Sequence, residues 1–205
     1  MIEAIVCDFG GVLSTPLAGS FAKWSTHSGL PAEALGEAIA AVAAADGAHP
    51  LYELECGRLS EQDFFARLEP HVGAPLAEFA DVYWSQLQPN APMIELMAEL
   101  RAPRGYRMAL LTNNVREWEP RWRAMFPVDE IFELVVDSSA VGLRKPDAEI
   151  YELTVERLGL PAESCLFVDD FEHNCAAARK LGMDAVQFHT NEQARAEIES
   201  ALLAA

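Results

Sequence analysis

The stretch that decides the fold is IEAIVCDFGGVL, residues 2–13, in which an apolar run stops at Asp8. An apolar run of this length bounded by glycines is typical of a buried strand in a parallel sheet covered on both faces. Asp8 is then expected at the carboxyl end of the strand, where open α/β sheets bind their ligands. Gly10 and Gly11 allow the backbone to turn sharply and to approach a ligand closely. Taken alone, the same residues also fit a turn that merely ends a strand.

Length and composition limit the class of protein. The chain has 205 residues, of which 51% are hydrophobic, so it can build one full α/β core with a modest insertion. The four cysteines show no metal-binding spacing, and we expect reduced, mostly buried thiols. Apolar segments fall short of the ~20 residues that span a bilayer, and Asp8 interrupts the first run too early for a signal peptide. We therefore expect a soluble, cytoplasmic protein.

The formal net charge of −17 restricts the partners. Long-range repulsion argues against binding to nucleic acid or to an anionic membrane surface. An anionic small substrate would need local positive charge or a bound cation to overcome the same field. The sequence does not decide between a monomer and a homodimer.

Two regions differ in their predicted elements. Residues 16–88 show helical patterns at 32–45, 59–68 and 76–87, with Ser60 as an N-cap, and no convincing strand. From residue 92 onward, helices at 93–100, 148–158, 174–181 and beyond 191 alternate with strands at 107–111, 132–136, 165–168 and 185–188. This alternation predicts a Rossmann-like, doubly wound parallel sheet, an α/β fold. We expect a core domain from residues 1–15 and 89–205 with a small inserted helical cap domain of about four helices, residues 16–88.

Polar residues follow several of the predicted strands. They are Asp8, Thr112 with Asn113, and Asp169 with Asp170, and a further polar segment, residues 142–146 with Lys145, precedes a helix. Each has an ordinary explanation as a cap or a turn. Their joint occurrence, in this order and at equivalent places, favours one site at one edge of the sheet.

Four ordered motifs carry a resemblance over nearly the whole chain. They are residues 8–12 (DFGGV), 111–113 (LTN), 144–146 (RKP), and 168–170 (VDD) with Asn174. In this order they resemble those of the haloacid dehalogenase-like hydrolase superfamily, whose members are mainly phosphatases. The helical insertion occupies the place of that family's cap.

The resemblance implies a role for each residue. Asp8 would be the nucleophile that attacks phosphorus to give an aspartyl-phosphate, which water then hydrolyses. A hard cation is needed to offset the repulsion between carboxylate and phosphate, and oxygen ligands suit Mg²⁺. Its ligands would be Asp8, the carbonyl of Gly10, Asp169 and Asp170.

The other motif residues would act on the phosphoryl group. Thr112 and Asn113 would donate hydrogen bonds to its oxygens. Lys145 would neutralise charge on the nucleophile and on the transferring group. Thr112 and Lys145 are therefore expected to be catalytic as well as substrate-binding.

One position departs from the family pattern. Its phosphatases usually carry a second Asp two residues after the nucleophile, as general acid and then base, and here that residue is Gly10. General acid–base assistance is worth ~10²–10⁴ in rate. We therefore expect a small phosphorylated metabolite with a leaving group of low pKa, such as a sugar 1-phosphate, or a proton donor from elsewhere.

Two other functions stay open. The dehalogenase branch of the superfamily also lacks the second Asp, but it does not need Mg²⁺, so the pair Asp169 and Asp170 would be unexplained. A catalytically weak protein that binds a phosphorylated ligand is also consistent with Gly10. Substrate contacts from the cap are not fixed by the sequence, and the polar or aromatic candidates are His27, His49, Tyr52, Arg58 and Trp84.

Overall fold

A parallel sheet of five strands forms the centre of the computed structural model, which describes residues 1–204. Its order is β3-β2-β1-β4-β5, and the strands are β1 (Ala4–Cys7), β2 (Arg107–Thr112), β3 (Leu134–Asp137), β4 (Cys165–Asp169) and β5 (Asp184–Gln187). Ala4 of the central strand pairs with Arg107 on one side and with Cys165 on the other. All four residues of β1 are fully buried, as the apolar run predicted.

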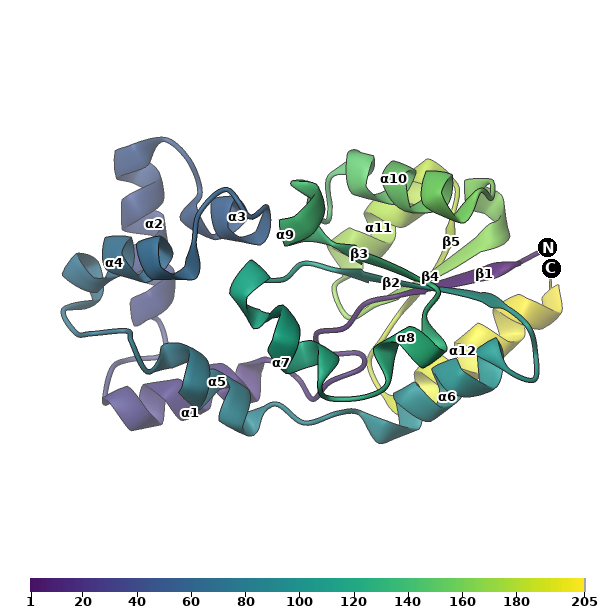
Figure 1. Ribbon diagram of the computed structural model, residues 1–205, viewed down its shortest axis with the longest axis horizontal. Helices are drawn as coiled ribbons and strands as arrows, with labels where there is room; N and C mark the ends of the chain where they lie inside the picture. The colour runs from purple at the N-terminus through teal and green to yellow at the C-terminus, as the bar shows by residue number, and fades with distance from the viewer. Residues whose placement is uncertain (205) are drawn as a thin grey trace.

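Helices cover both faces of the sheet, which confirms the doubly wound α/β fold. On one face lie α10 (Ala148–Leu158) and α11 (Glu172–Leu181), and on the other α6 (Ala91–Arg101) and α12 (Asn191–Ala204) (Figure 1). Side chains of β1 alternate between the two cores, because successive residues of a strand point to opposite faces. Ala4 and Val6 pack with α10 and α11, whereas Ile5 and Cys7 belong to the core beneath α6 and α12.

Short helical turns occupy the connections between the strands of the core. They are η1 (Arg116–Trp118), α7 (Glu119–Arg123), α8 (Val128–Ile131), α9 (Ser138–Val141) and η2 (Ala162–Ser164). Because α8 continues to Ile131, β3 begins at Leu134, two residues after the predicted start of the strand. Asp129 and Glu130 lie in the first turn of α8, where acidic side chains favour a helix.

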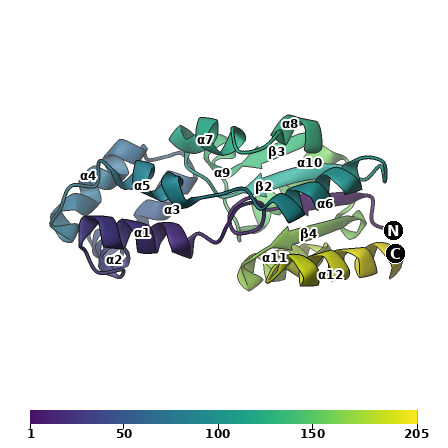
Figure 2. The same cartoon turned by 90° about the horizontal axis from the view of Figure 1, so that it is seen from below.

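Five helices follow β1 in the chain and pack beyond the carboxyl edge of the sheet (Figures 1 and 2). They are α1 (Ala18–Ser28), α2 (Ala34–Asp46), α3 (Pro50–Glu55), α4 (Glu61–Val72) and α5 (Phe79–Gln86). The sequence did not indicate α1, because Ser20 and Trp24 are its buried residues and give little apolar periodicity. Ser60 caps α4 as predicted, since its Oγ accepts a hydrogen bond from Asp63 N at 3.1 Å.

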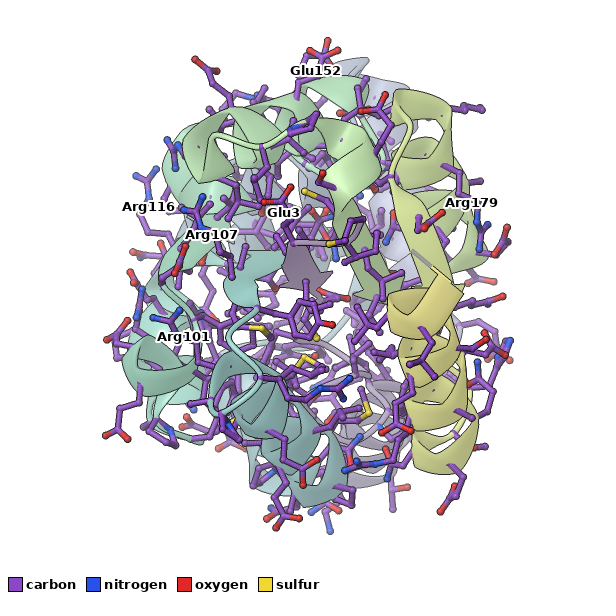
Figure 3. The ribbon with its side chains drawn as sticks, turned by 90° about the vertical axis from the view of Figure 1, so that its right-hand side faces the viewer. Glu3, Arg101, Arg107, Arg116, Glu152 and Arg179 are labelled. Carbon is purple, nitrogen blue, oxygen red and sulfur yellow. The ribbon has the colours of Figure 1, made fainter. Side chains whose placement is uncertain are left out.

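The opposite end of the molecule carries exposed ion pairs. Figure 3 looks onto this end, where Arg101 and Arg107 both contact Glu133, at 3.0 and 2.6 Å. Exposed pairs of this kind contribute ~0–1 kcal/mol each. None of the helices within residues 1–204 is long and apolar enough to cross a membrane.

Candidate active site

The carboxyl ends of β1, β2 and β4 bring the sequence-predicted residues together. Asp8 follows β1, Thr112 ends β2, and Asp169 ends β4. The three strand ends are aligned, because Cys7, which precedes Asp8, pairs with Leu110 on one side and with Val168 on the other. The three side chains are therefore presented from adjacent strands at one edge of the sheet.

Lys145 reaches this edge from the loop before α10 and is almost completely buried. Its Nζ lies 2.7 Å from Asp8 Oδ1 and 2.6 Å from Asp169 Oδ2. A buried ammonium is tolerated only with such partners, because transferring an unpaired charge out of water is costly. One cation nevertheless serves two buried carboxylates, so the cluster keeps an excess of negative charge.

This excess changes the proton affinity of the cluster. Burial raises the pKa of Asp8 from 3.8 to about 8; Lys145 opposes the rise, and the charges of Asp169 and Asp170 add to it. Burial also opposes the charged form of Lys145, but the two carboxylates outweigh it and hold its pKa above the ordinary value. Burial and Asp169 raise the pKa of Asp170 to about 6.

Asp169 is held by a full set of donors. Its Oδ1 accepts from Phe171 N at 2.8 Å and from Asn174 Nδ2 at 2.9 Å. Its Oδ2 accepts from Lys145 Nζ, and Asn174 Nδ2 lies 3.1 Å from the same atom. Asn174, in the first turn of α11, thus fixes the carboxylate that holds Lys145. The sequence placed Asn174 in a motif without giving it this contact.

The Asp170 carboxylate, unlike that of Asp169, is not held by a full set of hydrogen-bond donors. Its Oδ1 is buried and has no hydrogen-bond partner in the described residues. Gly11 makes room for this side chain, because a Cβ on Gly11 would lie 2.5 Å from Asp170 Oδ2. One carboxylate oxygen from each of Asp8, Asp169 and Asp170 lies within 4.8 Å of the others. An unpaired carboxylate oxygen in an all-oxygen, negatively charged cluster fits a hard cation such as Mg²⁺.

Thr112, the last residue of β2, and Asn113, which follows it, lie at the site but are engaged differently from the sequence-based expectation. Asn113 Nδ2 donates to the Lys145 carbonyl at 3.0 Å, and its Oδ1 accepts from Lys145 N at 2.8 Å. The side chain of Asn113 therefore holds the Lys145 loop in place. Thr112 is buried, and within residues 1–204 its hydroxyl makes only a long 3.5 Å contact with the neighbouring Asn113 carbonyl.

A cavity of about 310 Å³ extends from Gly10 and Asn113 to Ile39 on α2. Trp84 lines it, as one of the five candidates from the helical region. The other four do not line it. His27 pairs with Glu78, His49 stacks on Tyr52, and Arg58 pairs with Glu53.

A contact between α3 and the Lys145 loop was not foreseen from the sequence. Arg144 Nε lies 2.8 Å from Glu55 Oε2, and the Arg144 guanidinium stacks 3.8 Å from the centre of the Tyr52 ring. Ser138 Oγ also donates to the Glu55 carbonyl at 2.6 Å. These contacts join the inserted helices to the edge of the sheet beside the site.

The fold and the site define a Rossmann-like α/β core with a carboxylate–lysine cluster at the carboxyl edge of its sheet. The haloacid dehalogenase-like hydrolase profile matches residues 2–182, and the chain belongs to this family. Its relatives include phosphatases.

Three similar proteins illustrate the range of the family. Mouse "Acyl-CoA dehydrogenase family member 10" is 28% identical over 98% of this chain, which spans only 19% of that protein. Sesquiterpene phosphatase astK of Aspergillus oryzae is 29% identical over 64% of this chain and 68% of its own. The enzyme bt-2542 of Bacteroides thetaiotaomicron, solved with magnesium and inorganic phosphate, is 22% identical, covers 92% of this chain and 95% of its own, and has a TM-score of 0.70. The last likeness concerns the fold alone.

Proposed function

We propose that the chain is a Mg²⁺-dependent phosphatase that hydrolyses a small phosphate ester through an aspartyl-phosphate on Asp8. The observation that carries the proposal is the 2.7 Å contact between Asp8 Oδ1 and Lys145 Nζ, beside the unpartnered oxygen of Asp170. A nucleophilic carboxylate needs a fixed orientation and a nearby positive charge, and Lys145 provides both.

The chemistry follows from these positions. An Asp8 oxygen attacks phosphorus, the bond from phosphorus to the leaving oxygen breaks, and that oxygen leaves with its electron pair. Water then attacks the aspartyl-phosphate, which releases inorganic phosphate and restores the Asp8 carboxylate. Bound Mg²⁺ would supply charge neutralisation at the phosphoryl oxygens. We assign its ligands to Asp8, Asp169, Asp170 and the carbonyl of Gly10.

The phosphoryl oxygens need further donors. We assign them to Lys145 Nζ, the Thr112 hydroxyl and the backbone N–H of Asn113, because the Asn113 side chain is occupied by the Lys145 loop. The five helices of residues 16–88 would act as a cap that excludes water from the site. The Glu55–Arg144 pair supports this arrangement.

Relatives support phosphoryl chemistry over carbon–halogen chemistry. A sesquiterpene phosphatase and archaeal glyceraldehyde 3-phosphate phosphatases are among them. A dehalogenase would also leave the unpartnered carboxylate of Asp170 without a purpose. Gly10 favours a second candidate, a weakly active protein that binds a phosphate ester, because no carboxylate stands there to protonate the leaving group.

The test is hydrolysis of p-nitrophenyl phosphate with and without Mg²⁺. This ester has a good leaving group, so the absence of an acid at Gly10 should matter least. We expect wild-type turnover that requires Mg²⁺ and is lost in Asp8→Asn, while Asp184→Asn, at an exposed position on β5, keeps it. Turnover that survives in Asp8→Asn would remove Asp8 as the nucleophile. A folded wild-type protein that binds Mg²⁺ without turnover would favour the binding protein.

A further inference from the structure

The cavity beside the site is partly open to solvent and has the size of a ligand pocket. A volume of about 310 Å³ lies within the range of ~300–1,000 Å³ typical of small-molecule sites. Gly10 and Asn113 line it near the site, and it also extends to residues of α2 and α4, the helices that Figure 1 shows farthest from the sheet.

The lining is apolar and largely aromatic. Leucine and isoleucine side chains from α2 and α3 face aromatic side chains from α1, α4 and α5, including Phe64, Phe79 and Trp84. None of the described residues that line the cavity is Arg, Lys or His. A charged group is therefore favoured at the Lys145 end of the site and an apolar group in the cavity.

The polar side chains that do line the cavity are already engaged. Trp118 Nε1 donates to Glu61 Oε1 at 2.6 Å, and Glu55 is paired with Arg144. Asn113 is bound to the Lys145 loop, and Asn114 Oδ1 accepts from Val115 N at 2.9 Å. Trp84 Nε1 and the Tyr83 hydroxyl are the exceptions, since neither has a hydrogen-bond partner among residues 1–204. Sugar hydroxyls placed here would lose their water and gain few hydrogen bonds.

From the size, position and chemistry of this cavity we propose that the substrate is a phosphate ester whose leaving group is a bulky, apolar carbon skeleton. The inference rests on the proposed phosphatase and adds the class of substrate. The phosphoryl group lies at Asp8 and Lys145, and the skeleton fills the space between Gly10 and Ile39. We therefore expect apolar phosphate esters to be better substrates than the sugar 1-phosphates that the sequence suggested.

The experiment must separate apolar burial from leaving-group acidity. A series from phenyl phosphate to p-ethyl-, p-butyl- and p-octylphenyl phosphate does so, because a para-alkyl chain scarcely changes the acidity of the phenol. We expect kcat/KM to rise by about fourfold per methylene, the equivalent of ~0.8 kcal/mol, until the cavity is full. Equal kcat/KM values along the series, or a preference for glucose 1-phosphate, would overturn the inference and leave the phosphatase intact.

A cavity variant and a binding measurement complete the design. In Ile39→Trp the cavity is smaller, so the gain from the alkyl chain should fall, whereas Ile94→Trp, on α6 and outside the cavity, should keep it. Binding of decyl phosphate is followed through the fluorescence of Trp84 and Trp118, with glucose 1-phosphate as the comparison. Tight binding of decyl phosphate without turnover of any ester would support the apolar cavity and contradict the phosphatase. Equal weak binding of both ligands would contradict the cavity as an apolar site.

Discussion

Gly10 has no side chain to act as the proton donor that the resemblance leads us to expect there, yet its backbone has room for one. Its φ is not positive, so a side chain brings no left-handed strain. A Cβ there would lie 3.3 Å from Leu17 Cδ1, the end of a flexible side chain. The carboxylate is therefore absent because residue 10 is a glycine, and not because a side chain would lack space there.

We predict that Gly10→Asp makes the rate less sensitive to the leaving group. In the wild type, kcat should fall steeply as the pKa of the leaving phenol rises across substituted phenyl phosphates, because nothing protonates the departing oxygen. An added acid is worth ~10²–10⁴ for the poorest leaving groups. The measurement is kcat against phenol pKa for both proteins. A flat wild-type plot would mean that another residue already supplies the proton.

Asn174 shows how much one amide contributes to this site. Its Nδ2 donates to both oxygens of Asp169, the residue that holds Lys145. We predict that Asn174→Ala lowers the free energy of unfolding by ~1.5–3 kcal/mol, the usual contribution of hydrogen bonds to a charged group, because Phe171 N and Lys145 Nζ still bind Asp169. Urea unfolding measures the loss, and kcat should fall as well. The neighbouring exposed variant His173→Ala serves as the control and should change neither value.

The residues that the sequence brought together at one edge of the sheet are those whose place follows from the backbone. Asp8 and Asp169 lie at strand ends, and Lys145 meets both, so motif order and parallel topology were enough. The Asn113 contact could not be predicted, because it depends on which way one side chain turns. The cavity could not be predicted either, since it depends on how helices distant in sequence face one another.

At the scale of elements, the sheet and its helices were predictable because apolar runs and helical periodicity mark them directly. The short helices of the core, α1 and α3 were not, because their apolar faces are brief or absent. Packing of the inserted helices on the sheet edge depends on close backbone approach, which leaves little trace in a single sequence. Gly57, after α3, is such a point, with a φ of +64°.

We predict that Gly57→Ala disturbs the junction between α3 and the sheet edge. An added methyl would collide with the Ser139 carbonyl of α9 and approach Arg116 Nη2 to 2.5 Å. The matched control is Gly73→Ala, which has a φ of +76° but no atom within 4 Å of the added carbon. Gly57→Ala should be less stable than the control by ~1–3 kcal/mol, the usual cost of overpacking, in urea unfolding. Equal losses of stability in Gly57→Ala and Gly73→Ala would mean that the junction accommodates the added methyl group without a loss of free energy.

At the scale of the whole molecule, the buried carboxylates link folding to pH. The pKa of Asp8 rises from 3.8 to about 8 on folding, so the folded state binds more protons than the unfolded state between these values. Asp8 therefore makes its full contribution to the stability of the folded state below pH 3.8, and this contribution is lost as the pH rises through about 8. The metal-free protein should therefore become easier to unfold across this window.

We predict that Asp8→Asn reduces this slope by up to ~1.4 kcal/mol per pH unit, the value for one proton. Urea unfolding in the presence of a chelator, at a series of pH values and constant salt, measures it. Asp184→Asn should keep the wild-type slope. Added Mg²⁺ should stabilise the wild type more at higher pH, because the cation competes with the proton on Asp8. A slope unchanged by Asp8→Asn would show that other groups carry the pH dependence.

The central position of β1 has a consequence for synthesis of the chain. Its partners begin at Arg107 and Cys165, so four apolar residues made first must wait for neighbours made much later. At ~5–20 residues per second, the ribosome adds the second partner strand roughly 8–30 seconds after β1. Meanwhile α1–α5 emerge and can pack against one another. The nascent protein thus exposes the strand that becomes its centre while its periphery assembles, until β2 and β4 are made to cover it.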